Sequence, residues 1–167
     1  GCEIDDLDGS ADSLRGYQSL THGDAPDVIP SASTAADTQK VMTILKQLEA
    51  DGIEARQVCI ATRTNDDCVA MADALKHEGL QCQRLDRNTP DDASAPGARV
   101  ATMHRIKGLE FSVVIIAGYR GIQHYAEQIA RFEDAGVHED AEQAERCLLH
   151  VAATRAKRNL FVITRRR

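Results

Sequence analysis

The stretch ATMHRIKGLEFSVVII, residues 101–116, gathers side chains that bind phosphate and sugar groups between two runs of β-forming residues. It contains His104, Lys107, Gly108 and Glu110. His104 and Arg105 are suited to donating hydrogen bonds to phosphate oxygens, and Gly108 lets the backbone approach a ligand closely. A carboxylate can accept a hydrogen bond from a sugar hydroxyl, as acidic residues do in nucleotide pockets. The alternative is a polar turn whose side chains only cap the backbone.

A second cluster, HVAATRAKRNLFVIT at residues 150–164, places Arg155 among small residues. A guanidinium with small neighbours can reach across an interface, bind phosphate oxygens in a fork and stabilise charge during phosphoryl transfer. The alternative is a group of surface arginines that the dipole of a helix favours at its carboxyl end.

A third cluster, ATRTND at residues 61–66, places Arg63 and Asn65 just beyond a predicted strand. There they could contact a phosphate and a base edge. Capping of the following helix by Asn65 is the alternative, and both interpretations can hold together.

Other kinds of site are missing from the sequence. No G-x-x-x-x-G-K-[ST] stretch occurs, so the chain contains no phosphate-binding P-loop. The five cysteines are odd in number and show no C-x-x-C spacing, which predicts a reducing compartment and no metal site. A chain of this kind that contacts a nucleoside triphosphate supplies one wall of the site, and the other wall comes from elsewhere.

Composition predicts one domain with an aliphatic core. The chain has 167 residues, of which 43% are hydrophobic and only 4% aromatic. The formal net charge of -6 argues against a globally basic nucleic-acid binder, although the last twenty residues hold six Lys or Arg and no acid. No apolar run has the length of a membrane span and no secretory signal is visible, so a cytoplasmic location is the default expectation.

Hydrophobic periodicity predicts alternating helices and strands. Helices are expected at residues 34–51, 65–79, 125–132 and 139–158. Strands are expected at 57–62, 80–85, 99–103, 112–117 and 159–164, with a further short strand near Val28 and Ile29. Residues 86–98 are expected to form a loop. Continuously apolar strands between helices indicate a parallel sheet covered on both faces. Ligands bind such sheets at the carboxyl ends of the strands, where residues 62–65 and 102–110 are expected to lie.

Taken together, three segments resemble motifs of the UvrD/Rep-type superfamily 1 DNA helicases. The segment at 101–116 resembles their T-x-H-x-x-K-G-L-E-F motif, AERCLLHVAATRAKRNLFVIT resembles E-R-x-L-L-Y-V-A-x-T-R-A, and VCIATRTN resembles A-V-L-x-R-T-N. The resemblance covers most of residues 38–164. It implies the family's second RecA-like domain, a three-layer α/β fold, at residues 35–167. The 86–98 loop is too short for the accessory domain of many relatives, and residues 1–34 are expected to be an irregular N-terminal segment.

For the nucleotide, the resemblance implies that Glu110 contacts the ribose and Arg155 reaches the γ-phosphate. Lys107 and Gly108 match positions that shape the ribose-side turn. Gln18 occupies the place of a γ-phosphate-facing arginine in a Y-R-S motif, and glutamine carries no charge. Either Arg15 substitutes for that arginine, or catalysis is weaker, or the alignment is wrong there.

For the nucleic acid, the resemblance implies that Thr102 and His104 contact single-stranded DNA together with Arg63 and Asn65. The tyrosine of the family's L-L-Y-V-A stretch is His150 here, a second departure from the pattern.

The implied protein is an ATP-driven DNA translocase or helicase. ATP and Mg²⁺ would be bound mainly by the N-terminal RecA-like domain of the same full-length protein, so this chain is expected to be inactive alone. Two alternatives stay open: a non-catalytic nucleic-acid or protein-binding module that keeps the helicase fold, and a nuclease-fused relative.

Overall fold

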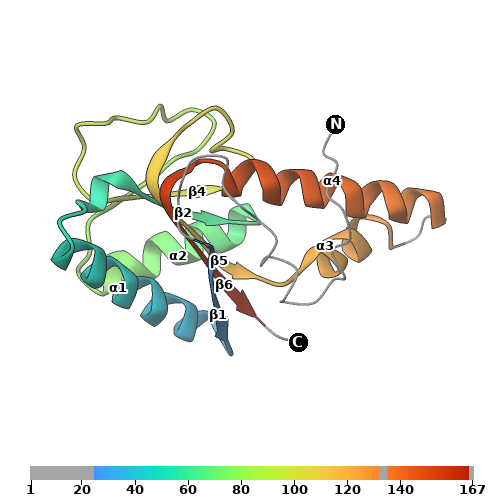
Figure 1. Cartoon of the computed structure of the whole chain (residues 1–167), viewed down its shortest axis with the longest axis horizontal. Coiled ribbons are helices and arrows are strands. Elements are labelled where there is room, and N and C mark those ends of the chain that lie inside the picture. The colour runs from blue at the N-terminus through green and yellow to red at the C-terminus, as the bar shows by residue number, and fades with distance from the viewer. Residues whose placement is uncertain (1–24, 132–134, 166–167) are drawn as a thin grey trace.

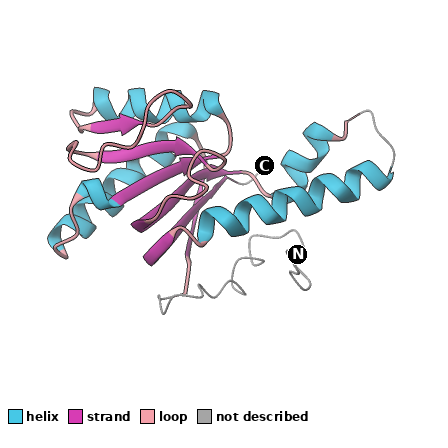
Figure 2. Cartoon of the chain, turned by 90° about the horizontal axis from the view of Figure 1, so that it is seen from above, coloured by secondary structure: helices cyan, strands magenta, loops and turns pink. Residues whose placement is uncertain are grey.

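Six strands with mostly apolar sequences form one parallel sheet in the computed structural model, which describes residues 25–131 and 135–165 (Figures 1 and 2). The strand order is β1-β6-β5-β2-β4-β3, and every neighbouring pair is parallel. The strands are β1 (Asp27–Ser31), β2 (Val58–Thr62), β3 (Cys82–Arg84), β4 (Ala98–Thr102), β5 (Phe111–Tyr119) and β6 (Ala156–Arg165).

Helices cover both faces of the sheet, as Figure 2 shows. The helical elements are α1 (Thr34–Ala50), the short 3-10 turn η2 (Ala55–Gln57), α2 (Asn65–His77), α3 (Ile122–Ile129) and α4 (Ala135–Ala153). Alternate residues of β2 point to opposite faces, because Ile60 packs in the core under α1 and α2 whereas Ala61 packs in the core under α4. The three-layer α/β fold predicted from the sequence is therefore confirmed.

The pair α3 and α4 forms a helical hairpin that projects beyond the sheet (Figure 1). The end of α4 near the sheet contributes Leu149 to the main core. A small separate cluster of Ala126, Ala130 and Ala141 joins the two helices where they project. Within the described ranges, no helix is long and apolar enough to cross a membrane.

The segment 103–110 crosses one face of the sheet. Because β4 and β5 are parallel, the chain must return from the carboxyl edge of the sheet to its amino edge between them. Met103 and Ile106 are completely buried along this path, and Leu109 N donates to Ile106 O at 2.9 Å. Gly108 has a φ of +85°, a left-handed conformation that favours glycine.

Two arginines hold the 86–97 connection between β3 and β4. Arg99 is 1% exposed, and it donates to the Asp91 carboxylate at 2.9 Å and to the carbonyls of Ala95 and Gly97 at 2.9 and 2.7 Å. Arg105 donates from Nε and Nη2 to two carbonyls of the same connection at 2.8 and 3.1 Å. This polar stretch therefore has a defined path across the surface.

Several predicted boundaries are wrong. The last helix ends at Ala153 rather than at residue 158, because residues from Ala156 onward pair with β5. The cap of α2 is Thr64, whose hydroxyl accepts from Asp67 N at 3.2 Å, and not Asn65. The short strand predicted near Val28 and Ile29 is confirmed as β1, which pairs with β6 at one side of the sheet.

Candidate functional site

Glu110 and Arg155 lie next to each other at the amino edge of the sheet. Glu110 immediately precedes β5 and Arg155 immediately precedes the neighbouring strand β6. Phe111 N donates to Arg155 O at 2.9 Å, so the two chain segments are in direct contact. Residues 102–110 were expected to lie together at the carboxyl edge. That expectation is wrong for Glu110, because the 103–110 segment crosses the sheet.

The guanidinium of Arg155 has only neutral partners among the described residues. Nε donates to Val151 O at 3.2 Å and Nη2 donates to Thr154 Oγ1 at 3.3 Å. No carboxylate of the described residues forms an ion pair with it. The side chain is half-buried. The end of α4 therefore fixes the position of the guanidinium, whose charge no carboxylate of residues 25–131 or 135–165 neutralises.

The carboxylate of Glu110 is 63% exposed and lies 3.4 Å from Lys157 Nζ. This pair is at the surface, where such contacts add little stability and exchange readily for another partner. A pocket of about 310 Å³ adjoins Glu110; its lining includes Arg56, Asp91, Arg99 and Lys157. Glu110 can therefore accept a hydrogen bond from a ligand in this pocket at small cost. Lys107 and Gly108 are exposed in the turn just before it.

The carboxyl edge of the sheet carries the residues predicted to bind nucleic acid. Thr62 and Thr102 are register partners at the ends of β2 and β4, and Met103 N donates to Thr62 O at 2.8 Å. Thr102 Oγ1 accepts from the backbone N of Arg105 at 3.2 Å, so this hydroxyl also caps the turn. His104 is exposed in that turn.

Asn65 and Arg63 follow β2 at the same edge. Asn65 is exposed at the first position of α2, where its side chain can meet a ligand. Arg63 is only 15% exposed, because it forms an ion pair with a buried acid of α4, Glu145. The four residues assigned to DNA thus share one edge of the sheet, opposite the edge of Glu110 and Arg155. Gln18, assigned to the nucleotide, lies outside the described residues.

Glu145 is a buried charged residue that the sequence analysis missed. Its carboxylate accepts from Arg63 Nε at 3.0 and 2.9 Å and from the Tyr119 hydroxyl at 3.0 Å. Burial and the nearby carboxylate raise the pKa of Tyr119 well above its usual range. The signal was available in the sequence, because Glu145 lies on the buried stripe that Ala141 and Leu149 define at helical spacing.

Electrostatics at this edge favour neutral His104. Partial burial and, to a smaller extent, the charge of Arg63 lower the pKa of His104 from its ordinary value, while Glu145 opposes the shift. These surroundings favour the neutral form of His104, and an anion bound beside it would favour the protonated form.

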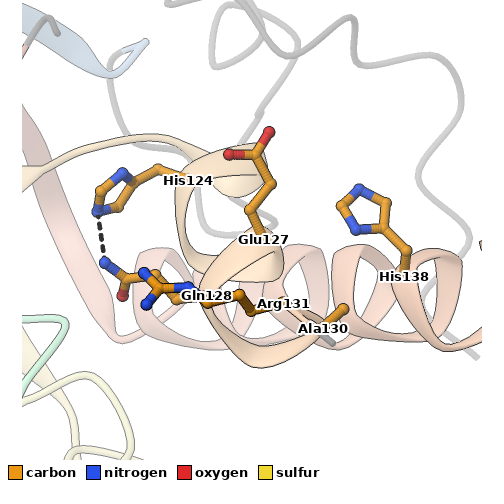
Figure 3. Close-up of a pocket in the computed structure, with 6 residues that line it drawn as sticks. All are labelled: His124, Glu127, Gln128, Ala130, Arg131 and His138. Carbon is orange, nitrogen blue, oxygen red and sulfur yellow. Dashed lines mark hydrogen bonds between the residues drawn. The ribbon is translucent and has the colours of Figure 1, made fainter. Parts of the chain in front are cut away.

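A further pocket lies on the projecting hairpin (Figure 3). It has a volume of about 440 Å³ and is lined by His124, Glu127, Gln128, Ala130, Arg131 and His138. His124 Nε2 lies 3.1 Å from Gln128 Nε2. Over residues 25–131 and 135–165, no group of three or more His, Cys, Asp or Glu side chains is arranged to hold a metal ion.

Comparison with known proteins gives one family match and two structural matches of interest. The family model of the UvrD-like helicase C-terminal domain matches residues 89–167. The C-terminal domain of a possible DNA helicase from Lactobacillus strain WCFS1 matches 85% of this chain and 74% of its own, with 24% identity and a TM-score of 0.62. The Hef helicase domain of Pyrococcus furiosus matches 77% of this chain and 26% of its own, with 12% identity and a TM-score of 0.42. The curated proteins contain no match.

The family match includes both the 101–116 segment and the segment around Arg155. The match to the Lactobacillus domain extends the shared fold over most of the chain. Both findings agree with the family inferred from the motifs: residues 89–167 match the model of the UvrD-like helicase C-terminal domain, and the fold matches the C-terminal domain of a possible DNA helicase.

Proposed function

We propose that this chain is the second motor domain of an ATP-dependent DNA helicase or translocase. The observation that carries the proposal is the contact between the segments of Glu110 and Arg155, joined through Phe111 N and Arg155 O at 2.9 Å. At this edge, an exposed carboxylate lies near a guanidinium that pairs with no carboxylate in the described part of the chain. These two groups fit the two ends of a nucleoside triphosphate, a ribose hydroxyl and a terminal phosphate.

At the amino edge, Arg155 would donate to oxygens of the γ-phosphate and stabilise the charge that develops during phosphoryl transfer. Glu110 would accept from a ribose hydroxyl after leaving its exposed contact with Lys157. Lys107 and Gly108 would shape the turn before Glu110. Gln18 is assigned to this group by resemblance alone.

At the carboxyl edge, Thr102, His104, Arg63 and Asn65 would contact the backbone of single-stranded DNA. The two edges belong to one sheet, and both the 103–110 segment and α4 run between them. Closure of the amino edge on ATP would therefore move the carboxyl edge and its DNA as one body.

The remaining parts of the motor would come from an N-terminal RecA-like domain of the full-length protein. That domain would hold the triphosphate and Mg²⁺, because this chain contains no P-loop. The 167-residue chain by itself would neither hydrolyse ATP nor unwind DNA.

The test is the Arg155→Ala variant of the full-length protein, with Arg158→Ala as the control. Arg158 is an exposed arginine three residues further on in β6. Arg155→Ala should lower kcat for ATP hydrolysis by about 10³ to 10⁵ while ATP binding is retained, as expected for an arginine finger. The control should hydrolyse ATP at nearly the wild-type rate. Near-normal turnover by Arg155→Ala would remove Arg155 from catalysis.

A further inference from the structure

Arg63 is assigned to DNA but is already bound to a buried acid. Glu145 is 2% exposed, and both of its oxygens accept from Arg63 Nε. A buried carboxylate is costly unless it is paired, so this contact is part of the folded structure rather than a passing surface pair. Any role of Arg63 in binding must therefore operate while Glu145 holds it.

The geometry of the contact leaves the outer end of the guanidinium available. Arginine has five N–H donors in a planar fork, and Glu145 engages the one on Nε. The Nη hydrogens make no hydrogen bond to other described residues. The ring of Tyr125 lies under the guanidinium, with Cζ 5.2 Å from the ring centroid. The fork is thus fixed along one side and one face, and its Nη end remains for another ligand.

Glu145 is itself held in orientation by β5. The Tyr119 hydroxyl, at the end of that strand, donates to Glu145 Oε1 at 3.0 Å. The rings of Tyr119 and Tyr125 lie 5.2 Å apart. The chain of contacts from Tyr119 through Glu145 to Arg63 therefore sets the direction of the guanidinium at the carboxyl edge.

We propose that Glu145 is a positioning residue for nucleic-acid binding, which orients the Nη end of Arg63 toward a backbone phosphate of single-stranded DNA. The proposal rests on the proposed function, because it takes DNA as the ligand of the carboxyl edge. It assigns Glu145 and Tyr119 a role that acts only through Arg63.

Because Glu145 is negatively charged, the direction in which its removal changes DNA affinity distinguishes a positioning role from a purely electrostatic one. Removing a carboxylate near a bound polyanion should tighten binding if Glu145 acts only through its long-range field. Loss of a positioned phosphate contact should instead weaken binding and reduce its salt dependence. For single strands, each phosphate contact contributes about 0.7 to the slope of log K against log salt.

The experiment measures binding of a fluorescent oligothymidine to the 167-residue chain by anisotropy, across a range of salt concentrations. Glu145→Gln should weaken binding about tenfold, as expected for one charge-assisted hydrogen bond. It should also reduce the salt slope by about 0.7. In an Arg63→Ala background, Glu145→Gln should cause no further weakening.

The matched control is Glu142→Gln, which removes the same charge one turn earlier on α4. Glu142 pairs with Arg146 at 3.7 Å and makes no described contact with Arg63. Its replacement should leave the oligothymidine affinity unchanged or slightly tighter.

Tyr119→Phe provides a second arm in case Glu145→Gln does not fold. It keeps the Glu145 charge and removes one donor that orients the carboxylate. Binding should weaken about threefold in the wild-type background and remain unchanged in the Arg63→Ala background.

Two results would overturn the inference in distinguishable ways. The first result is that the wild-type chain binds DNA but Glu145→Gln binds it equally or more tightly, or that Glu145→Gln or Tyr119→Phe weakens binding by the same factor with and without Arg63. In that case Glu145 does not act by positioning Arg63. If the wild-type chain fails to bind oligothymidine at low salt, the assigned DNA edge fails, and this inference fails with it.

Discussion

Replacing Arg99 with methionine should destabilise the fold by removing the side chain that holds the 86–97 connection. Arg99 is 1% exposed and donates hydrogen bonds to the carboxylate of Asp91 and to the carbonyls of Asp92, Ala95 and Gly97. Methionine keeps the apolar stem and removes the charge and all of these donors.

The size of the effect follows from these contacts. Net contributions of about 1.5 to 3 kcal/mol for each hydrogen bond to a charged group would give an upper limit of about 6 to 12 kcal/mol for four bonds. The acceptors can regain water when the connection loosens, because Asp91 is 24% exposed and Asp92 lies at the surface. Breaking a buried pair from one side costs about 3 to 5 kcal/mol, and we expect a loss in that range.

Urea unfolding followed by circular dichroism gives the free energy of unfolding for each variant. Arg56→Met is the matched control, because Arg56 lines the same pocket but pairs with Glu54 while 51% exposed. The control should lose less than about 1 kcal/mol. If Arg99→Met also loses less than about 1 kcal/mol, the buried contacts of Arg99 do not stabilise the connection.

Two further predictions concern His104 and the glycines. Single-stranded DNA should bind the wild-type chain more tightly as the pH falls from 7.5 to 5.5, because bound phosphates favour protonated His104, whose pKa is lowered in the free protein. Anisotropy titrations should show a flatter pH profile for His104→Gln, and an unchanged profile would exclude His104 as the titrating contact. Gly97→Ala should lower the free energy of unfolding in urea by more than about 3 kcal/mol, because the new Cβ would lie 2.2 Å from Gln81 O. Gly52 has a similar φ and no atom within 4 Å of a built Cβ, so Gly52→Ala should lower it by only about 1 to 2 kcal/mol. Equal losses for the two variants would refute the steric argument.

Local patterns predicted the elements whose burial follows directly from their hydrophobic residues. Val41, Ile44 and Leu48 recur at helical spacing and are buried in α1. The first four residues of β2 form a continuous apolar run, and all five residues of the strand are buried near the centre of the sheet. In these segments, the hydrophobic pattern and the tertiary environment agree, so periodicity alone was sufficient.

The end of α4 was mispredicted because local propensity and tertiary pairing disagree there. Alanine, arginine and lysine around Arg155 favour a helix up to residue 158. The backbone from Ala156 onward instead pairs with Phe111 and the rest of β5. Strand pairing across the sheet decided the boundary, and no local signal reports it.

The positions of the candidate site residues needed the three-dimensional arrangement. The motif around Glu110 has the sequence of a loop after a strand. Only the parallel direction of β4 and β5, which lie on either side of β2, requires that loop to cross to the opposite edge. The partner of Arg63 lies 82 residues away, at Glu145. The residue types indicated the chemistry of the site, but the separation of its two edges follows from topology.

Hydrogen exchange in the full-length protein tests the central claim that the nucleotide and DNA occupy opposite edges of this sheet. A non-hydrolysable ATP analogue should protect residues 108–111 and 154–157 at the amino edge. Single-stranded DNA should protect residues 62–65 and 102–105 at the carboxyl edge. Protection of one common edge by both ligands, or no protection of residues 108–111 and 154–157 by a bound ATP analogue, would contradict the account.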